Sequence, residues 1–331
     1  MRINKFSFFL LLCSVYLQAQ ISYTHKTSLL ASPFEIIVIA KDTTQAKIYV
    51  SNAVNEVKRI ENLISDWLPN SQISQVNAAA GIKSIVVDKE VFELVQRAIN
   101  LSKLTSGAFD ISYASMDKIW KFDGSMREKP SAEAILNSVK RVGYKKITLE
   151  PKTSSLFLKE EGMKLGLGGI GQGYIADKIK DLLINQGCSS GLVNVSGDIT
   201  TWGETLENKP WQVAIVNPFN KEKVFAWFPL VNSAVETSGS YEKYVTFDGI
   251  RYSHIIDPRT GWPSKGIISV SVFAPKTELA DALSTAIFVL GIETGLNLIN
   301  QLKDIECLII DDKGGFHVSE KLVLDTQINN K

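Results

Sequence analysis

The segment from residue 166 to 177, G-L-G-G-I-G-Q-G-Y-I-A-D, constrains the fold most strongly, because five of its twelve residues are glycine. Glycine has no Cβ, so the backbone can turn sharply and bring its N–H groups close to a bound group. An apolar pattern with helical spacing follows. A helix that begins here would point its free N–H groups and positive dipole end at an anion such as phosphate. The segment predicts a phosphate-binding loop, and a strand-to-helix turn with nothing bound is the alternative.

The N-terminus has the pattern of a secretory signal. Arg2 and Lys5 precede the apolar run F-S-F-F-L-L-L, and small or polar residues follow up to Ala19. The apolar run is too short to span a bilayer. We therefore expect a signal peptide at 1–19, a mature chain at 20–331, and export to the periplasm. Cys13, which follows three leucines, offers the alternative of a lipid anchor at the inner membrane.

The composition is that of a globular protein without a strong electrostatic field. The 331 residues include 36 Lys and Arg against 35 Asp and Glu, a net charge of +1. This balance argues against binding to nucleic acid. The length suits a single large domain. Cys188 and Cys307 lie in or beside predicted core strands, as two buried thiols or, in an oxidising compartment, as one disulfide.

Apolar periodicity predicts an α+β fold, with helices grouped early and strands grouped later. Helices are expected at 47–64, at 89–105, after Pro130, at 175–186, and at 279–301 with a break near Gly291. Strands are expected at 34–40, 155–158, 191–195, 211–216, 244–247, 251–256, 267–273 and 305–310.

The glycine segment also contains G-x-G-x-x-G, the fingerprint of a dinucleotide-binding Rossmann unit. That fingerprint should follow the first strand of a parallel sheet and be followed by an acidic residue at the end of the next strand. Here it lies in the middle of the chain, and Asp198 comes late for the acidic role. A nicotinamide-dependent dehydrogenase is therefore a minor alternative.

Three further segments carry residues suited to chemistry. In A-D-A-L-S-T-A (280–286), Asp281 and Thr285 share one helix face, and their oxygens suit Mg²⁺ or Ca²⁺. Ser284 lies on the adjacent position and could contribute. In S-H-I-I-D-P-R-T-G-W-P (253–263), His254 could act as a general base. The turn T-S-G-A-F-D places Asp110 where it could approach a ligand. Each segment alone is more often an ordinary helix start or turn.

Together these segments resemble the ApbE family, the FAD:protein FMN transferases. The matching motifs, in the same order and at similar separations, are G-G-I-G-Q-G-Y-I-A-D (168–177), N-V-S-G-D-I (194–199), E-T-S-G-S-Y-E-K-Y (236–244), H-I-I-D-P-R-T-G-W-P (254–263) and A-D-A-L-S-T-A-I-F-V-L-G (280–291). The resemblance runs from about Leu29 to Lys321.

The resemblance implies an exported enzyme with an α+β fold related to the tunnelling fold. Such an enzyme binds FAD as its substrate together with Mg²⁺. It transfers FMN to a Thr or Ser hydroxyl of an exported or membrane acceptor protein, such as a subunit of a membrane redox complex, and releases AMP. The alternatives are a metal-dependent FAD pyrophosphatase, which yields FMN and AMP, and a flavin-binding protein without activity.

The resemblance also assigns residues to roles. The catalytic residues are His254 and Asp281. The metal ligands are Asp281, Thr285, the backbone carbonyl of Gly169, and Ser284, where some relatives have an acid. The nucleotide contacts fall on Leu30, Trp67, Ala108, Phe109, Asp110, Gly168, Gly169, Gln172 and Ile256. This chain departs from many relatives at Gly166, where they have Asp, at Gln172, where they have Lys or Glu, and at Leu30, where they have Met.

Overall fold

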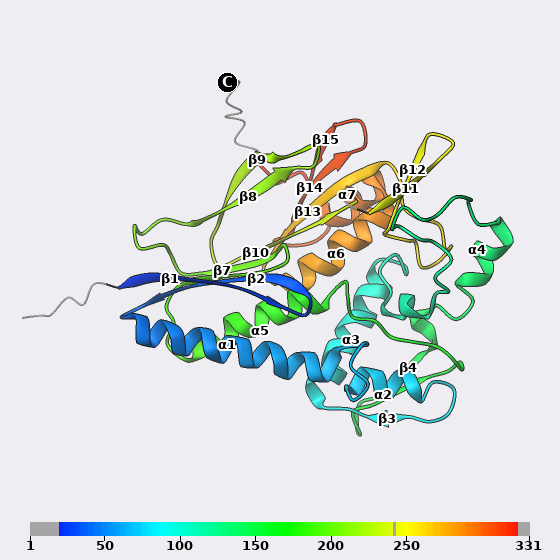
Figure 1. Ribbon diagram of the computed structural model, residues 1–331, viewed down its shortest axis with the longest axis horizontal. Helices are drawn as coiled ribbons and strands as arrows, with labels where there is room; N and C mark the ends of the chain where they lie inside the picture. Colours follow the sequence, from blue (N-terminus) through cyan, green and yellow to red (C-terminus); the bar gives the residue numbers. More distant parts are fainter. Residues whose placement is uncertain (1–19, 241–242, 324–331) are drawn as a thin grey trace, which may run out of the picture.

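The computed structural model describes residues 20–240 and 243–323, apart from the side chains at 221 and 222. The predicted signal peptide and Cys13 lie outside these residues. In the described ranges, the central sheet has eight strands, and every pair of neighbouring strands in it is antiparallel (Figure 1). The order of the strands in the sheet differs from their order in the chain. Its strands, in spatial order, are β1 (Ile21–Leu29), β2 (Ser32–Ala40), β6 (Gly191–Val195), β7 (Asp198–Trp202), β10 (Ala234–Gly239), β13 (Ile267–Ala274), β14 (Glu306–Asp311) and β15 (Phe316–Val318).

One face of this sheet is covered by helices and the other by a two-stranded ribbon (Figure 1). The helices are α1 (Thr43–Ile64), α5 (Gly171–Asn185), α6 (Thr277–Leu290) and α7 (Ile292–Asn300), and the ribbon is β8 (Trp211–Asn217) with β9 (Asn220–Leu230). Covering both faces explains why β2 is almost continuously apolar. Ile36 and Val38 pack in the helix-side core, whereas Ile39 packs against the ribbon.

A smaller body lies beside the helical layer, at the right of Figure 1. It contains a three-stranded antiparallel sheet, two short helices and the longer α3. Their bounds are β3 (Ile85–Val86), β4 (Ile147–Glu150), β5 (Ser155–Leu158), α2 (Gln72–Ala78), α3 (Lys89–Leu104), α4 (Ala132–Ser138), and the 3₁₀ turns η1 (Ile111–Ser115) and η2 (Tyr144–Lys146). A last ribbon pairs β11 (Tyr244–Phe247) with β12 (Ile250–Ser253).

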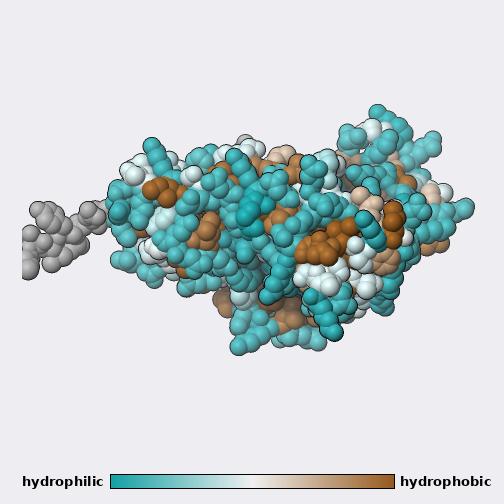
Figure 2. Space-filling model, turned by 90° about the horizontal axis from the view of Figure 1, so that it is seen from below, coloured by the Kyte–Doolittle hydropathy of each residue, from teal (hydrophilic) through white to brown (hydrophobic). Residues whose placement is uncertain are grey.

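The helices form where amphipathic spacing and capping agree. The side chain of Asp42 accepts a hydrogen bond from Gln45 N and so caps α1. The buried residues of α1 recur every three or four positions, which places one apolar stripe on the sheet. The opposite side of the helical layer is mainly hydrophilic, with separate hydrophobic patches (Figure 2). Among the described residues, no helix has both the length and the hydropathy needed to cross a membrane.

The structure decides several of the expectations. The α+β class is confirmed, and Gly291, with a φ of 82°, separates α6 from α7 as predicted. The predicted helix at 175–186 begins earlier, at Gly171, so part of the glycine segment is helical. Every pair of described strands is antiparallel, and the glycine segment follows β5 of the small sheet, so the Rossmann alternative is wrong. Cys188 and Cys307 are two unpaired, buried thiols.

Candidate active site

The first turn of α6 is fixed by a carboxylate of α5. Asp177 Oδ1 accepts hydrogen bonds from the backbone N and the hydroxyl of Thr277, at 3.0 and 2.8 Å, and Oδ2 accepts one from Glu278 N at 3.1 Å. These N–H groups belong to the helix start, where no intrahelical acceptor exists. Asp177 therefore caps α6 from outside and fixes the helix that carries Asp281.

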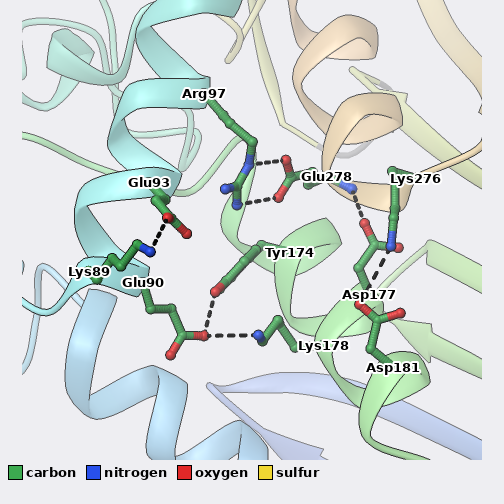
Figure 3. A pocket seen from close by; sticks show the side chains of 10 residues that line it. All are labelled: Lys89, Glu90, Glu93, Arg97, Tyr174, Asp177, Lys178, Asp181, Lys276 and Glu278. Carbon is green, nitrogen blue, oxygen red and sulfur yellow. Dashed lines mark hydrogen bonds and ion pairs between the residues drawn. The ribbon is translucent and has the colours of Figure 1, made fainter. Parts of the chain in front are cut away.

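Ion pairs hold α3, α5 and α6 together around a charged pocket of about 610 Å³ (Figure 3). Arg97 on α3 forms two hydrogen bonds with Glu278 on α6, at 2.5 and 2.9 Å. Glu90 on α3 accepts a hydrogen bond from the hydroxyl of Tyr174 and lies 3.5 Å from Lys178 Nζ, both on α5. The charged side chains that line this pocket are paired with one another, so they link the three helices.

Close packing requires glycine at two positions of the segment, Gly166 and Gly173. A Cβ on Gly173 would lie 2.4 Å from Thr277 O, and one on Gly166 would lie 2.9 Å from the Cβ of Ala114. None of the five glycines of the segment has a positive φ. The turn at 168–170 therefore does not depend on the left-handed backbone conformation that favours glycine. The absent side chains let neighbouring chain segments approach.

An Asp at position 166, which the family resemblance leads us to expect in many relatives, would not fit here without a shift. The ring of Tyr113 would lie 3.3 Å from a Cβ at Gly166, and its hydroxyl would lie 2.9 Å from a Cβ at Gly168. Tyr113 thus occupies the space beside residues 166–170, which precede α5 and which we call the glycine loop. No local sequence signal marks Tyr113, because its pattern is that of a surface tyrosine.

A second pocket, of about 480 Å³, opens beside the glycine loop. Four of the predicted nucleotide-contacting residues line it: Leu30, Trp67, Gly168 and Gln172. Trp67 is 79% exposed, and Lys118 Nζ lies over its ring at 5.1 Å from the centroid. A ring as exposed as this could also stack on a flat ligand. We call this cavity the glycine-loop pocket.

The predicted nucleotide contacts at 108–110 lie next to Gly169 of the glycine loop. The ring of Phe109 would be 3.5 Å from a Cβ at Gly169, and Ala108 is buried next to it. The carboxylate of Asp110 accepts hydrogen bonds from two backbone N–H groups, at 2.8 and 2.7 Å, which belong to η1 and η2. The Asp110 side chain therefore holds this turn together.

The segment 254–263 packs against the turn that contains Gly107. The side chain of Arg259 would be 3.5 Å from a Cβ at Gly107. His254 is exposed, with its Nδ1 3.2 Å from Lys243 O and its ring edge-on to Phe122. Ile256 forms an isolated bridge with Pro263 and packs in a small aromatic cluster.

Three buried carboxylates meet between the sheet and α6. Asp198 begins β7, Glu236 lies on β10, and Asp281 lies on α6; one carboxylate oxygen from each comes within 4.8 Å of the others. They are only 4%, 7% and 5% exposed. Gly173 N donates to Asp281 Oδ2 at 3.2 Å, so the cluster touches the start of α5. We call these residues the carboxylate cluster. Sequence reasoning missed Glu236 and the contact of Asp198 with Asp281.

The predicted metal ligands divide between two sides of α6. Thr285 Oγ1 would lie 3.4 Å from a Cβ at Gly169, so Thr285 faces the glycine loop. Ser284 faces the sheet, where its hydroxyl lies 2.9 Å from Ser238 Oγ and donates to Asp281 O at 2.9 Å. The structure thus brings Thr285 to Gly169 and Asp281 to Gly173, within the same glycine segment. Their carboxylate, hydroxyl and carbonyl oxygens are donors that suit Mg²⁺.

Burial raises the pKa of each carboxyl in the cluster. The pKa of Asp281 rises to about 7, although the hydrogen bond from Gly173 N opposes this shift. The pKa values of Asp198 and Glu236 also rise well above their usual range, first through burial and then through the neighbouring negative charges. At neutral pH the cluster therefore favours either bound protons or a bound cation.

This shift predicts that the metal-free protein loses stability as pH rises. A carboxyl whose pKa is raised by folding contributes its stability fully below its unfolded pKa of about 4 and loses it as pH rises through the folded pKa. For Asp281 that loss accumulates between about pH 4 and pH 7 and levels off above pH 7. We expect the free energy of unfolding in EDTA to fall by about 1 kcal/mol per pH unit between those values. Urea unfolding at pH 5–8 measures it, and Asp281→Asn should flatten the curve; an equal slope in both proteins would contradict the assignment.

Known proteins resemble this chain over most of its length. A sequence profile described as the ApbE family matches residues 30–309. The chain belongs to the ApbE family. An ApbE relative from Klebsiella pneumoniae (strain 342), named FAD:protein FMN transferase, is 31% identical over 290 residues, covering 87% of this chain and 89% of the relative. A relative of the same name from Treponema pallidum (strain Nichols) is 32% identical over 265 residues, covering 76% and 73%.

Solved ApbE structures share the fold over nearly the whole chain. The ApbE protein from Thermotoga maritima superposes with a TM-score of 0.81 at 29% identity, covering 91% of this chain and 97% of the other. The flavinyl transferase ApbE from Pseudomonas stutzeri, in its apo form, gives 0.79 at 27% identity, covering 91% and 94%. The family resemblance read from the motifs is confirmed. The relation to the tunnelling fold and the role of each site residue stay predictions.

Proposed function

We propose that this chain transfers FMN from FAD to a Thr or Ser hydroxyl of an acceptor protein and releases AMP, with Mg²⁺ at Asp281. Support comes from family membership and from the names of the relatives, which are FAD:protein FMN transferases. One observation carries the site. Thr285 approaches Gly169 of the glycine loop, and Asp281 accepts a hydrogen bond from Gly173 N at the start of α5. Gly168 and Trp67 line the adjoining glycine-loop pocket.

The reaction needs little covalent participation from the protein. The acceptor oxygen forms a bond to the FMN phosphorus, the bond from that phosphorus to the bridging oxygen breaks, and AMP leaves with that oxygen. Bound Mg²⁺ would neutralise charge on the diphosphate. The backbone around Gly168 would hold the phosphates, and Trp67 would stack on a ring of FAD. A base must accept the hydroxyl proton, and His254 is the candidate.

His254→Ala is expected to slow transfer by about 10²-fold or more, the usual range for loss of a general base, while changing FAD affinity much less. The carbonyl of Lys243 lies 3.2 Å from His254 Nδ1 and favours a proton there, so Nε2 is the nitrogen that would accept the hydroxyl proton. Single-turnover rates and FAD titration separate the two effects. His317→Ala, which removes a histidine paired with Asp311 on β14, is the control. Equal losses of rate and affinity would indicate a binding role.

A metal-dependent FAD pyrophosphatase on the same scaffold is the second candidate, because water could replace the acceptor hydroxyl in the same attack. The protein is incubated with FAD and Mg²⁺, with and without a purified candidate acceptor. Mass spectrometry then detects covalent FMN, and chromatography detects free FMN and AMP. A covalent adduct that an acceptor variant with Ala at the modified residue does not form supports transfer. Rapid release of FMN and AMP without acceptor supports hydrolysis.

We also propose that the protein is exported to the periplasm after removal of residues 1–19. The supporting pattern is the basic and apolar N-terminus, and β1 begins at Ile21, just after the expected cleavage point. Mass spectrometry of the mature N-terminus from the secreted fraction tests this proposal. An N-terminus near Gln20 supports simple export, a lipidated Cys13 supports an anchor, and an intact Met1 would contradict both.

A further inference from the structure

We propose that Glu236 and Asp198 bind a divalent cation together with Asp281, so that the central sheet adds two ligands to those that α6 supplies. The catalytic meaning of this site rests on the proposed flavin transfer. The cation site itself rests on the geometry of the carboxylate cluster.

The register between β7 and β10 places two carboxylates opposite each other. These strands are antiparallel, with Val235 opposite Ile199 and Ala234 opposite Thr200. Continuing the same register places Glu236 opposite Asp198 on the helix-facing side of the sheet. Like charges directly opposite in a sheet are destabilising. Both side chains are buried, so water does not screen them. Such a pair requires neutralisation, which a cation between the strands and α6 would provide.

Both strand carboxylates have an oxygen whose hydrogen-bonding capacity is unused. Asp198 Oδ1 and Glu236 Oε2 are buried and have no hydrogen-bond partner in the structure. Buried polar atoms are nearly always satisfied, and the exceptions point to a missing water or ion. Within the part of the chain that the structure describes, no Lys, Arg or His side chain forms an ion pair with any of the three carboxylates. The described residues therefore supply no positive counter-charge to the carboxylate cluster.

The three carboxylates are close enough to one another to share one cation. The three carboxylate oxygens lie within 4.8 Å of one another. Ligands at opposite sides of Mg²⁺ or Ca²⁺ are separated by about 4–5 Å, because their metal–oxygen distances are about 2.0–2.6 Å. A single cation can therefore contact all three residues with little movement.

Ser284 and Ser238 hold Glu236 in place for this role. Ser238 donates to Glu236 Oε1 at 3.2 Å, and the hydroxyls of Ser238 and Ser284 lie 2.9 Å apart. These bonds engage one oxygen of Glu236 and leave Oε2 toward the cluster. On the sheet side of α6, the carboxylate of Glu236 is thus the strong ligand, and the hydroxyl of Ser284 supports it.

The test measures Mn²⁺ binding without FAD or acceptor, by electron paramagnetic resonance or calorimetry at pH 8. We expect Glu236→Gln and Asp198→Asn each to weaken Mn²⁺ binding by at least tenfold. In EDTA, both variants should melt at a higher temperature than the parent, because a buried like charge is removed. Glu35→Gln on β2, which pairs with the exposed Lys26, is the matched control and should change neither.

Two variants keep the test decisive if one fails to fold. Unchanged Mn²⁺ affinity in a folded Glu236→Gln or Asp198→Asn protein overturns the inference, and a lower melting temperature in EDTA with unchanged affinity identifies a structural role instead. The outcome is separate from that of the proposed function. Tight Mn²⁺ binding through Glu236, in a protein that transfers no FMN, would support this site and contradict the proposed transferase activity.

Discussion

Asp281→Asn is expected to reduce flavin transfer by on the order of 10³-fold at saturating Mg²⁺ and FAD. Asp281 is the one residue of α6 whose side chain meets both the start of α5, through Gly173 N, and the two strand carboxylates. Loss of a metal ligand removes several kcal/mol of charge stabilisation from the transition state, and each 1.4 kcal/mol is about tenfold in rate. The measurement is the rate of covalent FMN formation on a fixed acceptor.

The loss should occur without unfolding. Asn has nearly the same shape as Asp and no charge, so it removes one of three crowded negative charges. The variant should therefore be at least as stable as the parent in EDTA at pH 8, by circular dichroism and urea unfolding. Asp181→Asn makes the same chemical change on the exposed side of α5, where Asp181 pairs with Lys276, and should keep full activity. Normal turnover of Asp281→Asn would remove the cation from the proposed mechanism.

Local sequence pattern predicted the elements whose hydrophobic period is clear. The strands at 155–158, 191–195 and 244–247 were predicted with the bounds that the structure shows. β1 and β10 were missed for a physical reason. β1 is a polar-alternating edge strand with no fully buried residue, and β10 reads A-V-E-T-S-G, in which half of the residues are typical of turns. Their strand character comes from pairing with β2 and β13.

The same distinction applies to the site. Asp281 and Thr285 could be found because helical spacing alone puts them on one face of α6. Asp198 and Glu236 could not be joined to them, because their approach depends on the long-range register of β7 on β10. The motifs N-V-S-G-D-I and E-T-S-G-S-Y contained both acids. An acid beside an apolar strand segment, where it must be buried, is the signal that could have singled them out.

Gly173→Ala is expected to destabilise the protein by about 1–3 kcal/mol and to lower flavin transfer as well. An added Cβ would lie 2.4 Å from Thr277 O and 2.8 Å from Glu278 N, both in the backbone of the first turn of α6. Alanine favours a helix over glycine by about 1 kcal/mol, but overpacking against rigid backbone costs about 1–3 kcal/mol or more and should outweigh that gain. To relieve the contact, α6 must move away from α5, which carries Asp281 away from Gly173 N.

Urea unfolding and Mn²⁺ affinity measure the two consequences of this movement, because a displaced Asp281 should weaken cation binding even where the variant is fully folded. Gly171→Ala is the matched control for stability. Its Cβ would meet its nearest neighbour, Ile64 Cδ1, at an ordinary 3.5 Å, so helix propensity should dominate and the variant should be as stable as the parent or more so. If Gly173→Ala matched the control in stability and kept the parent's Mn²⁺ affinity, close packing of α5 on α6 could not be what positions Asp281.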